Sequence, residues 1–463
     1  MAGAVLKLEQ SETERQDRRH LLHPFTDLNF MERSERTVIA RAKGNYVYDE
    51  AGRRYLDGLG GMWCSNIGHG RDEMAAAIAE QARTLDYYSP FDDLTNPVMA
   101  ELGEVLAARA PGDLNRVIYT TGGSTAADTA IRLIHHYWLR QGEPKRRHIL
   151  TRDHAYHGST YLTASLSDRG YCDGWLRDEQ FIHHLSAPYA YREGAGLSEG
   201  EFCDKLVAEM KAKIEEIGPE NIACFIGEPI LGSGGVIVPP DGYHRRTYDL
   251  CHSYGILYVS DEVVTGFGRL GHIFASQSRF GITPDIITCA KGITSGYVPL
   301  GAVIISDRLY EVLSQPGARF NNGFTYSGHP VACRAALKNI EIIERENLCE
   351  RVRTLGPVFE KRLGELRDLP LVGEVRGSHF MMCVEYVADK KARTLFDEDV
   401  RIGKRIWRNC QKRGLLVRPL SHLNVLSPPL TLFEEEIHFI ADVLRDAIRE
   451  TADEVSRDGI KAV

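Results

Sequence analysis

The chain lacks several features that would place it among membrane or secreted proteins. Its 463 residues contain no run of eighteen apolar residues and no internal repeat, so we predict no membrane-spanning helix. The first twenty residues are charged and lack the apolar stretch of a signal peptide. The ten cysteines form no C-x-x-C pair, and several lie in apolar runs, as is typical of buried thiols in a reducing compartment. These absences predict a cytoplasmic protein.

An excess of positive charge is also missing. Lysine and arginine number 56 against 64 acidic residues, which gives a net charge of −8 and no general attraction to nucleic acid or anionic lipid. His154 and His157 are spaced as metal ligands can be, but no third ligand has suitable spacing. We therefore predict that the protein binds no nucleic acid, no membrane and no metal.

Hydrophobic residues make up 43% of the chain, enough for a large core and for two or three structural units. Residues 1 to about 30 are expected to form a mobile arm or an arm draped over a partner, and residues 43–56 a hairpin with its turn at 49–52. We place an N-terminal arm and part of a small domain at 1–70, a large domain at 71–330 and a C-terminal small domain at 331–463.

From about residue 70 the pattern alternates between helix and strand. Residues 124–140 carry Ala127, Ile131, Ile134 and Trp138 at helical spacing, which predicts a helix with one buried face. The expected strands are apolar on both faces, which is typical of a mostly parallel sheet covered by helices. They span residues 117–120, 148–150, 222–226, 256–260, 285–290 and 300–305. Beyond Pro330, a long amphipathic helix to about residue 347 leads into a shorter α+β pattern.

Ligands of such sheets bind beyond the carboxyl ends of the strands. The sequence Gly122-Gly123-Ser124 joins a strand to a helix, so its backbone N–H groups could bind one phosphate. An ordinary glycine turn with Ser124 as N-cap is the alternative. The strand at 256–260 ends in Asp261-Glu262, where a carboxylate could bind a protonated ring nitrogen or begin a solvated loop.

Two further strand ends complete the set. Lys291 precedes a loop of small residues and could lose its proton and attack an aldehyde, although a lone lysine there is usually solvated. Tyr156, followed by His157 and Gly158, offers an aromatic face for a flat ring. Together the four segments supply a phosphate cup, a ring stack, a carboxylate for a ring nitrogen and a Schiff-base lysine.

At these residues the sequence resembles the class III, or omega, aminotransferases among the fold type I pyridoxal phosphate enzymes. The resemblance covers nearly the whole chain, and its most specific part is residues 260–269 (SDEVVTGFGR), Pro284-Asp285 and residues 290–292 (AKG). It implies an α/β fold, with a large cofactor-binding domain around a mostly parallel seven-stranded sheet and a smaller α+β domain. It also implies pyridoxal 5'-phosphate as the cofactor.

The resemblance implies a role for each matching residue. Thr325, in residues 323–330 (GFTYSGHP), corresponds to a residue that reaches the phosphate bound by the other subunit, which implies a homodimer with shared active sites, or a tetramer. The other cofactor residues are Lys291 for the Schiff base, Asp261 for the ring nitrogen, Val263 behind the ring, Gly123 and Ser124 for the phosphate, Tyr156 for the stack with His157 beside it, and Glu228 near the cofactor.

The substrate side resembles the amine:pyruvate branch of the family. Arg418 matches the arginine that binds a substrate carboxylate and swings aside for amines without one, although a solvated charge is the alternative. The matching aromatic residues, for which core packing is the alternative, are Phe25, Trp63, Phe91 and Tyr156.

Two departures from the family pattern stand out. Thr125 replaces a glutamate that relatives usually carry, and Ala127 replaces a commoner asparagine or other polar residue, so the hydrogen bonds behind the phosphate cup are expected to differ. Asp92 and Asp93 follow Phe91 in a loop that is more apolar in relatives. These two carboxylates could favour a cationic donor such as a diamine.

The function implied is a pyridoxal phosphate-dependent omega-transaminase that moves an amino group from a primary amine or omega-amino acid to pyruvate by a ping-pong mechanism. A putrescine-like diamine, β-alanine and taurine are alternative donors. An aminomutase or racemase is an alternative reaction on the same scaffold, and a catalytically inactive binding module is an alternative of another class.

Overall fold

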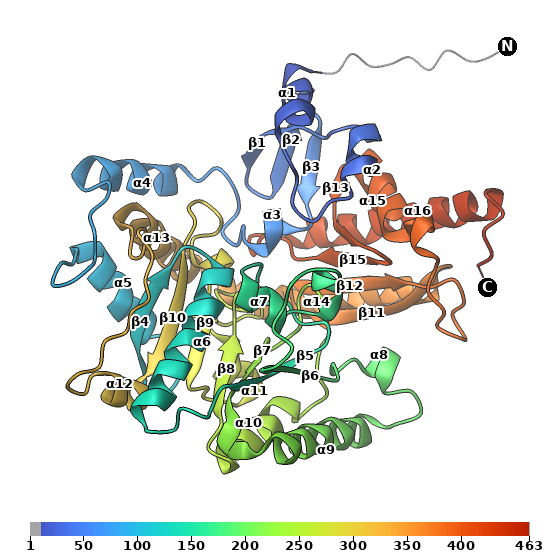
Figure 1. Ribbon diagram of the computed structural model, residues 1–463. Coiled ribbons are helices and arrows are strands. Elements are labelled where there is room, and N and C mark those ends of the chain that lie inside the picture. The colour runs from blue at the N-terminus through green and yellow to red at the C-terminus, as the bar shows by residue number, and fades with distance from the viewer. Residues whose placement is uncertain (1–10, 463) are drawn as a thin grey trace.

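The computed structural model describes residues 11–462 and contains a central seven-stranded sheet (Figure 1). Its strand order is β4-β10-β9-β8-β7-β5-β6, in which β10 is antiparallel to both neighbours and the pairs from β9 to β6 are parallel. The strands are β4 (Leu114–Thr120), β5 (His148–Arg152), β6 (Ile182–Leu185), β7 (Ile222–Gly227), β8 (Leu257–Asp261), β9 (Ile286–Cys289) and β10 (Gly301–Ser306). Six follow the predicted apolar runs. The seventh, β6, was missed because two histidines interrupt its apolar pattern.

Helices cover both faces of this sheet, as the two-sided apolar strands predict. Ile149 and Ile226 pack with α6 (Gly123–Arg140), whereas their neighbours Leu150 and Phe225 pack with the opposite layer. That opposite layer contains α9 (Glu199–Ile217) and α10 (Tyr243–Ser253). Successive side chains point to opposite faces of a strand, so each strand contributes to two cores. The shorter helices of this part are α7 (Tyr161–Leu166), α8 (Ala190–Glu193), α11 (Ala275–Phe280) and α12 (Asp307–Leu313).

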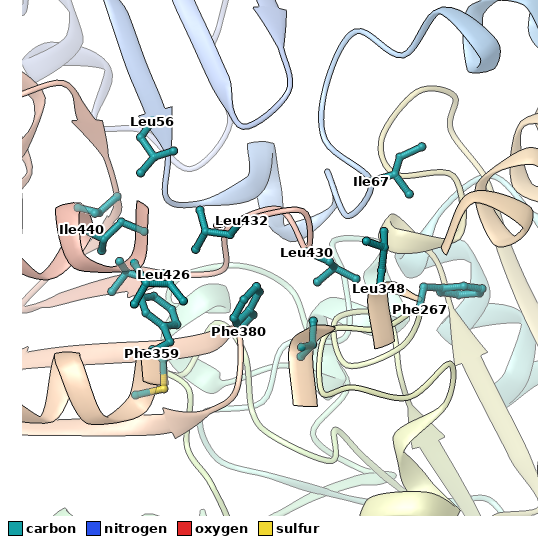
Figure 2. Packing of buried hydrophobic residues seen from close by; sticks show 14 of the residues in the cluster. Leu56, Ile67, Phe267, Leu348, Phe359, Phe380, Leu426, Leu430, Leu432 and Ile440 are labelled. Atoms are coloured by element: carbon teal, nitrogen blue, oxygen red, sulfur yellow. The ribbon is translucent and has the colours of Figure 1, made fainter. Parts of the chain in front are cut away.

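One large apolar cluster continues from the central sheet into the C-terminal part of the chain. Figure 2 shows Phe267 near Leu348, with Phe359, Phe380 and Ile440 farther along the same cluster. Helices α4 (Asp72–Thr84), α5 (Pro97–Ala107) and α13 (Pro330–Arg345) border it, and α13 packs against both of the others.

The C-terminal part contains an antiparallel sheet in the order β11-β12-β15-β14. Its strands are β11 (Val372–Ser378), β12 (Met381–Tyr386), β14 (Arg418–Leu420) and β15 (Leu423–Leu426). The accompanying helices are α14 (Leu348–Gly364), α15 (Ile402–Lys412) and α16 (Glu434–Arg457). The predicted α/β fold with a smaller α+β part is therefore confirmed.

A third sheet combines strands from the N-terminal part and the C-terminal part of the chain. The predicted hairpin is present as β2 (Tyr46–Asp49) and β3 (Arg54–Asp57), and β1 (Ile39–Lys43) pairs with β2. The fourth strand, β13 (Leu415–Leu416), comes from the C-terminal part and runs parallel to β3. A short helix, α3 (Gly60–Trp63), follows the hairpin.

The expected N-terminal arm is partly helical where the structure describes it, and residues 1–10 lie outside the described range. Two helices, α1 (Glu12–His20) and α2 (Leu28–Arg33), were not predicted. Ser11 and Asp27 cap them by accepting hydrogen bonds from Glu14 N and Phe30 N, which satisfies amides that lack helical partners. Across residues 11–462, no helix is long and apolar enough to cross a membrane.

Candidate active site

A cavity of about 180 Å³ lies where several strands of the central sheet end. It brings together eight residues that were singled out separately in the sequence, as well as three others. The lining residues are Gly123, Ser124, Tyr156, His157, Gly158, Glu228, Ser233, Asp261, Val263, Val264 and Lys291.

Asp261 is the last residue of β8, and its carboxylate is fixed from two sides. Its Oδ2 lies 2.6 Å from His157 Nδ1, and its Oδ1 accepts a hydrogen bond from Val263 N at 3.1 Å. The side chains of Asp261 and His157 are buried. His157 Nε2 is also buried and has no hydrogen-bond partner among the described residues. A buried carboxylate held in one orientation suits the protonated nitrogen of a heterocycle.

The neighbouring Glu262 turns away from the cavity. Its carboxylate accepts hydrogen bonds from Ala275 N at 2.6 Å and Ser276 N at 2.9 Å at the start of α11. Burial raises the pKa of Glu262, and these hydrogen bonds act in the opposite direction. The two consecutive carboxylates therefore have different surroundings, and only Asp261 lines the cavity.

Lys291 follows β9 and starts a 3₁₀ turn with a left-handed φ of +46°. Its Nζ lies 5.3 Å from the centre of the Trp63 ring. Burial lowers the pKa of Lys291, although the negative charges of Asp261 and Glu228 oppose this effect. Within residues 11–462, no side chain pairs with its ammonium group in an ion pair or hydrogen bond. The neutral amine, which is the nucleophilic form, is therefore more accessible than for a solvated lysine.

The start of α6 and the loop between β5 and α7 leave no space for a side chain at two glycines. A Cβ on Gly123 would lie 3.0 Å from Val263 Cγ1, and one on Gly158 would lie 2.5 Å from Ser124 Oγ. Gly158 also has a φ of +144°, and Ser159 N donates to Ser124 Oγ at 3.1 Å. The amides at the start of α6 and the Ser124 hydroxyl can therefore approach a phosphate closely.

The two departures behind this cup have a clear structural result. Thr125 Oγ1 donates to Gly122 O at 2.9 Å and so holds the turn. Ala127 is fully buried in the apolar layer between α6 and the sheet. The hydrogen bonds behind the cup are thus local to the turn, and Ala127 contributes only packing.

Glu228 closes another side of the cavity. Its carboxylate accepts hydrogen bonds from Tyr156 N at 3.0 Å and Gly232 N at 2.7 Å, and burial raises its pKa. Beneath this turn, His244 Nε2 donates to Pro229 O at 2.8 Å. Burial lowers the pKa of His244 to about 3, so His244 is a neutral support for the turn.

The expected substrate side gathers around Trp63 and Tyr156. Arg418 Cζ lies 5.9 Å from the centre of the Trp63 ring, and Arg418 Nη1 lies 2.6 Å from Met62 Sδ. Burial lowers the pKa of Arg418, but arginine remains charged at neutral pH. The Phe25 ring contacts Tyr156 edge-on at 6.0 Å between centroids.

Tyr171 also lies at this site and was missed in the sequence. Its ring lies 5.4 Å from Tyr156 and 6.0 Å from Phe25, and burial raises its pKa to about 12. Tyr171 lies in a 3₁₀ turn without strand or helix periodicity, so no local pattern indicates it. Ser233 lies in the same segment after β7 as Glu228. Its position after the carboxyl end of a predicted strand is the signal in the sequence that indicates it.

Phe91 and Thr325 do not line the Lys291 cavity of the same chain. Phe91 borders a separate cavity of about 930 Å³ beside α5 and β4, together with Gly323. A Cβ on Gly323 would lie 3.3 Å from Phe91 Cζ, and Tyr87 Oη donates to Thr325 O at 2.7 Å. The loop that carries Phe91 and the segment that carries Thr325 therefore lie side by side and border a cavity other than the one that Lys291 lines.

The residues that line the cavity fit pyridoxal phosphate in their chemistry. The start of α6 offers anion-binding amides, Tyr156 and Val263 offer surfaces for a ring, and Asp261 offers a carboxylate for the ring nitrogen. Lys291 offers an amine of lowered pKa. On the fold described above, these features define a pyridoxal phosphate enzyme of fold type I.

Comparison with known proteins gives the family. Residues 30–448 match the family model described as Aminotransferase class-III. A putrescine–pyruvate aminotransferase of Pseudomonas aeruginosa is 39% identical over 98% of this chain and 99% of its own. An (S)-enantioselective omega-transaminase from Thermomicrobium roseum has a TM-score of 0.92 at 42% identity, covering 94% of this chain and 98% of that one. A PMP-bound aminotransferase from Vibrio fluvialis has a TM-score of 0.92 at 36% identity, covering 96% of this chain and 99% of that one.

The chain belongs to the class-III aminotransferases. It is an aminotransferase that depends on pyridoxal phosphate, and the cofactor and enzyme class predicted from the sequence are confirmed.

Proposed function

We propose that this aminotransferase moves the amino group of a primary amine or omega-amino acid to pyruvate by a ping-pong mechanism. The observation that carries the proposal is that two cationic side chains lie close to the ring of Trp63. Lys291 Nζ lies 5.3 Å and Arg418 Cζ 5.9 Å from its ring centre. A keto acid has its carboxylate next to its reacting carbonyl carbon, so its two ends match Arg418 and Lys291. The Pseudomonas relative is named for pyruvate.

Each cofactor-side residue has a task in this proposal. Bound pyridoxal phosphate supplies an aldehyde for the lysine and a ring that accepts electrons. Asp261, oriented by His157 and Val263 N, holds a proton at the ring nitrogen. Lys291 Nζ removes the proton from the donor carbon and returns a proton during transfer, which its lowered pKa favours.

The same pocket has to accept donors with and without a carboxylate. Between residues 11 and 462, no Asp or Glu pairs with Arg418, and its Nη1 donates to the thioether of Met62. A thioether is a weak hydrogen-bond acceptor, so little is lost when the guanidinium leaves it. Arg418 can therefore bind a keto acid in one half-reaction and swing aside for an apolar amine in the other.

The proposal includes a homodimer with shared active sites. It is supported by the location of Phe91 and Thr325, which lie in neighbouring segments and do not line the Lys291 cavity of their own chain. A second copy could place both residues at its neighbour's cofactor. Sedimentation of the cofactor-loaded protein tests this, and a monomer with full activity would contradict it.

A diamine such as putrescine is the second candidate for the donor. Asp92 and Asp93 are exposed in the loop of Phe91, which packs beside the Thr325 segment, so both carboxylates would accompany Thr325 to a neighbour's site. They could bind the distal ammonium of a diamine. Replacing both with asparagine should weaken putrescine turnover more than 1-phenylethylamine turnover. Equal effects on the two donors would remove the support for a diamine.

A panel of amine donors with pyruvate, scored for alanine, tests the reaction and ranks the donors. The decisive variant is Lys291→Ala, which should lose turnover and the yellow absorbance of the loaded enzyme, because it has no amine to join the cofactor. A yellow and active variant would contradict the role of Lys291. Alanine formation separates transamination from an aminomutase or racemase, which gives no net transfer to pyruvate.

A further inference from the structure

The loop that carries Lys291 is held by a buried side chain from a distant helix. Asn339 lies in α13 and is fully buried. Its Nδ2 donates to Gly292 O at 2.8 Å and to Ile293 O at 3.0 Å, and its Oδ1 accepts from Ser295 Oγ at 2.5 Å. One amide group therefore contacts three of the four residues that follow Lys291.

These contacts use the full donor capacity of the asparagine. The two carbonyl oxygens can only accept, which fixes the orientation of the amide. Ser295 Oγ donates to Asn339 and accepts from Ile67 N at 3.1 Å, so the network also reaches the segment after Trp63. Gly292 O, Ile293 O and Ser295 Oγ would each lose a partner if Asn339 were removed.

The backbone of this loop needs outside support. Lys291 and Ser295 have φ values of +46° and +50°, a region that non-glycine residues rarely adopt and that persists when the surroundings hold it. A Cβ on Gly292 would also lie 2.5 Å from Asn66 Nδ2. Asn66 and Asn339 are therefore both packed against the turn.

We propose that Asn339 is a positioning residue for the catalytic lysine, because it holds the strained turn that aims Lys291 into the cavity. This proposal rests on the role of Lys291 proposed above. Proton transfer by Lys291 requires placement within hydrogen-bonding reach of the reacting carbon, and a displacement of about 1 Å can reduce a rate by about 100-fold.

Asn339→Ser tests the proposal in the cofactor-loaded enzyme, with Asn424→Ser as the matched control. Asn424 is also fully buried, donates to two carbonyl oxygens, of Gly403 and Leu423, and accepts from the hydroxyl of Tyr386. It lies in β15, and none of the hydrogen bonds described for residues 11–462 joins it to residues 290–297. Three quantities are measured. The first is the pH at which the visible absorbance of the Schiff base between Lys291 and the cofactor has changed by half, called the midpoint below. The others are the backbone hydrogen exchange of residues 290–297 and kcat.

We expect Asn339→Ser to raise the midpoint by about 0.5 to 1 pH unit, because a looser turn admits water and reverses part of the burial around Lys291. Exchange in residues 290–297 should become faster, and kcat should fall by about 10- to 100-fold. Asn424→Ser should lower thermal stability but leave the midpoint and this exchange unchanged.

An unchanged midpoint and unchanged loop exchange in a folded Asn339→Ser enzyme would overturn the proposal, as would equal shifts in Asn424→Ser. If Asn339→Ser does not fold, Ser295→Ala removes one contact from the same network and has to shift the midpoint in the same direction. A wild-type enzyme without visible absorbance would instead contradict the role of Lys291 itself, so the two failures are distinguishable.

Discussion

Replacing Arg418 with alanine should separate the two half-reactions of the enzyme. In the structure the guanidinium contacts Met62 Sδ and lies 5.9 Å from the Trp63 ring centre, and no carboxylate of the described residues pairs with it. A hydrogen bond to a charged group contributes about 1.5–3 kcal/mol. Because about 1.4 kcal/mol corresponds to a tenfold change in rate, kcat/KM for pyruvate should fall by about 10- to 150-fold.

The donor half-reaction should change much less when the donor has no carboxylate. With 1-phenylethylamine the wild-type guanidinium gains no partner, so we expect a loss of less than about 3-fold from altered packing at Trp63. Stopped-flow absorbance follows each half-reaction separately, first with the amine alone and then with pyruvate added to the aminated enzyme. Arg418→Lys is the control, because it keeps the charge but loses the planar pair of donors.

Two results of this experiment would refute the reasoning. An equal loss in both half-reactions would show that Arg418 supports the pocket as a whole rather than binding the acceptor. Full pyruvate activity in Arg418→Ala would show that another group binds the carboxylate. Partial recovery in Arg418→Lys, confined to the pyruvate half-reaction, would support the charge as the main contribution.

The remaining predictions concern the cofactor cup and its support. Gly158→Ala should raise the Kd of pyridoxal phosphate at least about tenfold, because its Cβ would lie 2.5 Å from Ser124 Oγ at a φ of +144°. Gly174→Ala, at a φ of +76° with open space around it, is the control. An equal rise in the Kd of pyridoxal phosphate in both variants would count against a phosphate cup at Gly158. Burial lowers the pKa of His244 from 6.5 to about 3, so the stability that neutral His244 contributes is complete above pH 6.5 and is lost as the pH falls toward 3. Between pH 6.5 and about pH 5, the free energy of unfolding should therefore fall by about 2 kcal/mol more in the wild type than in His244→Gln. Denaturant unfolding at each pH measures the free energy of unfolding. An equal change with pH in the wild type and in His244→Gln would contradict the prediction.

The sequence by itself determined which chemical groups the site contains and the layers of the fold. Strands that are apolar on both faces require a helix layer on each side, and the structure has α6 on one face and α9 and α10 on the other. Asp261 and Lys291 were found because parallel strands place the residues after their carboxyl ends at the same edge of the sheet. Strand β6 and helices α1 and α2 were missed, because their patterns are short or interrupted by polar residues.

The tertiary structure decided which of these groups share a cavity. Asp261 and Glu262 are adjacent in sequence, yet only Asp261 faces Lys291, because the amides at the start of α11 bind Glu262. Tyr171 reaches the substrate side by packing against the rings of Phe25 and Tyr156, which are distant in sequence. Asn339 is more than forty residues away in sequence from the carbonyl groups of the lysine loop to which it donates. Such contacts depend on how the elements pack in three dimensions, and local periodicity reports only which face of a single element is buried.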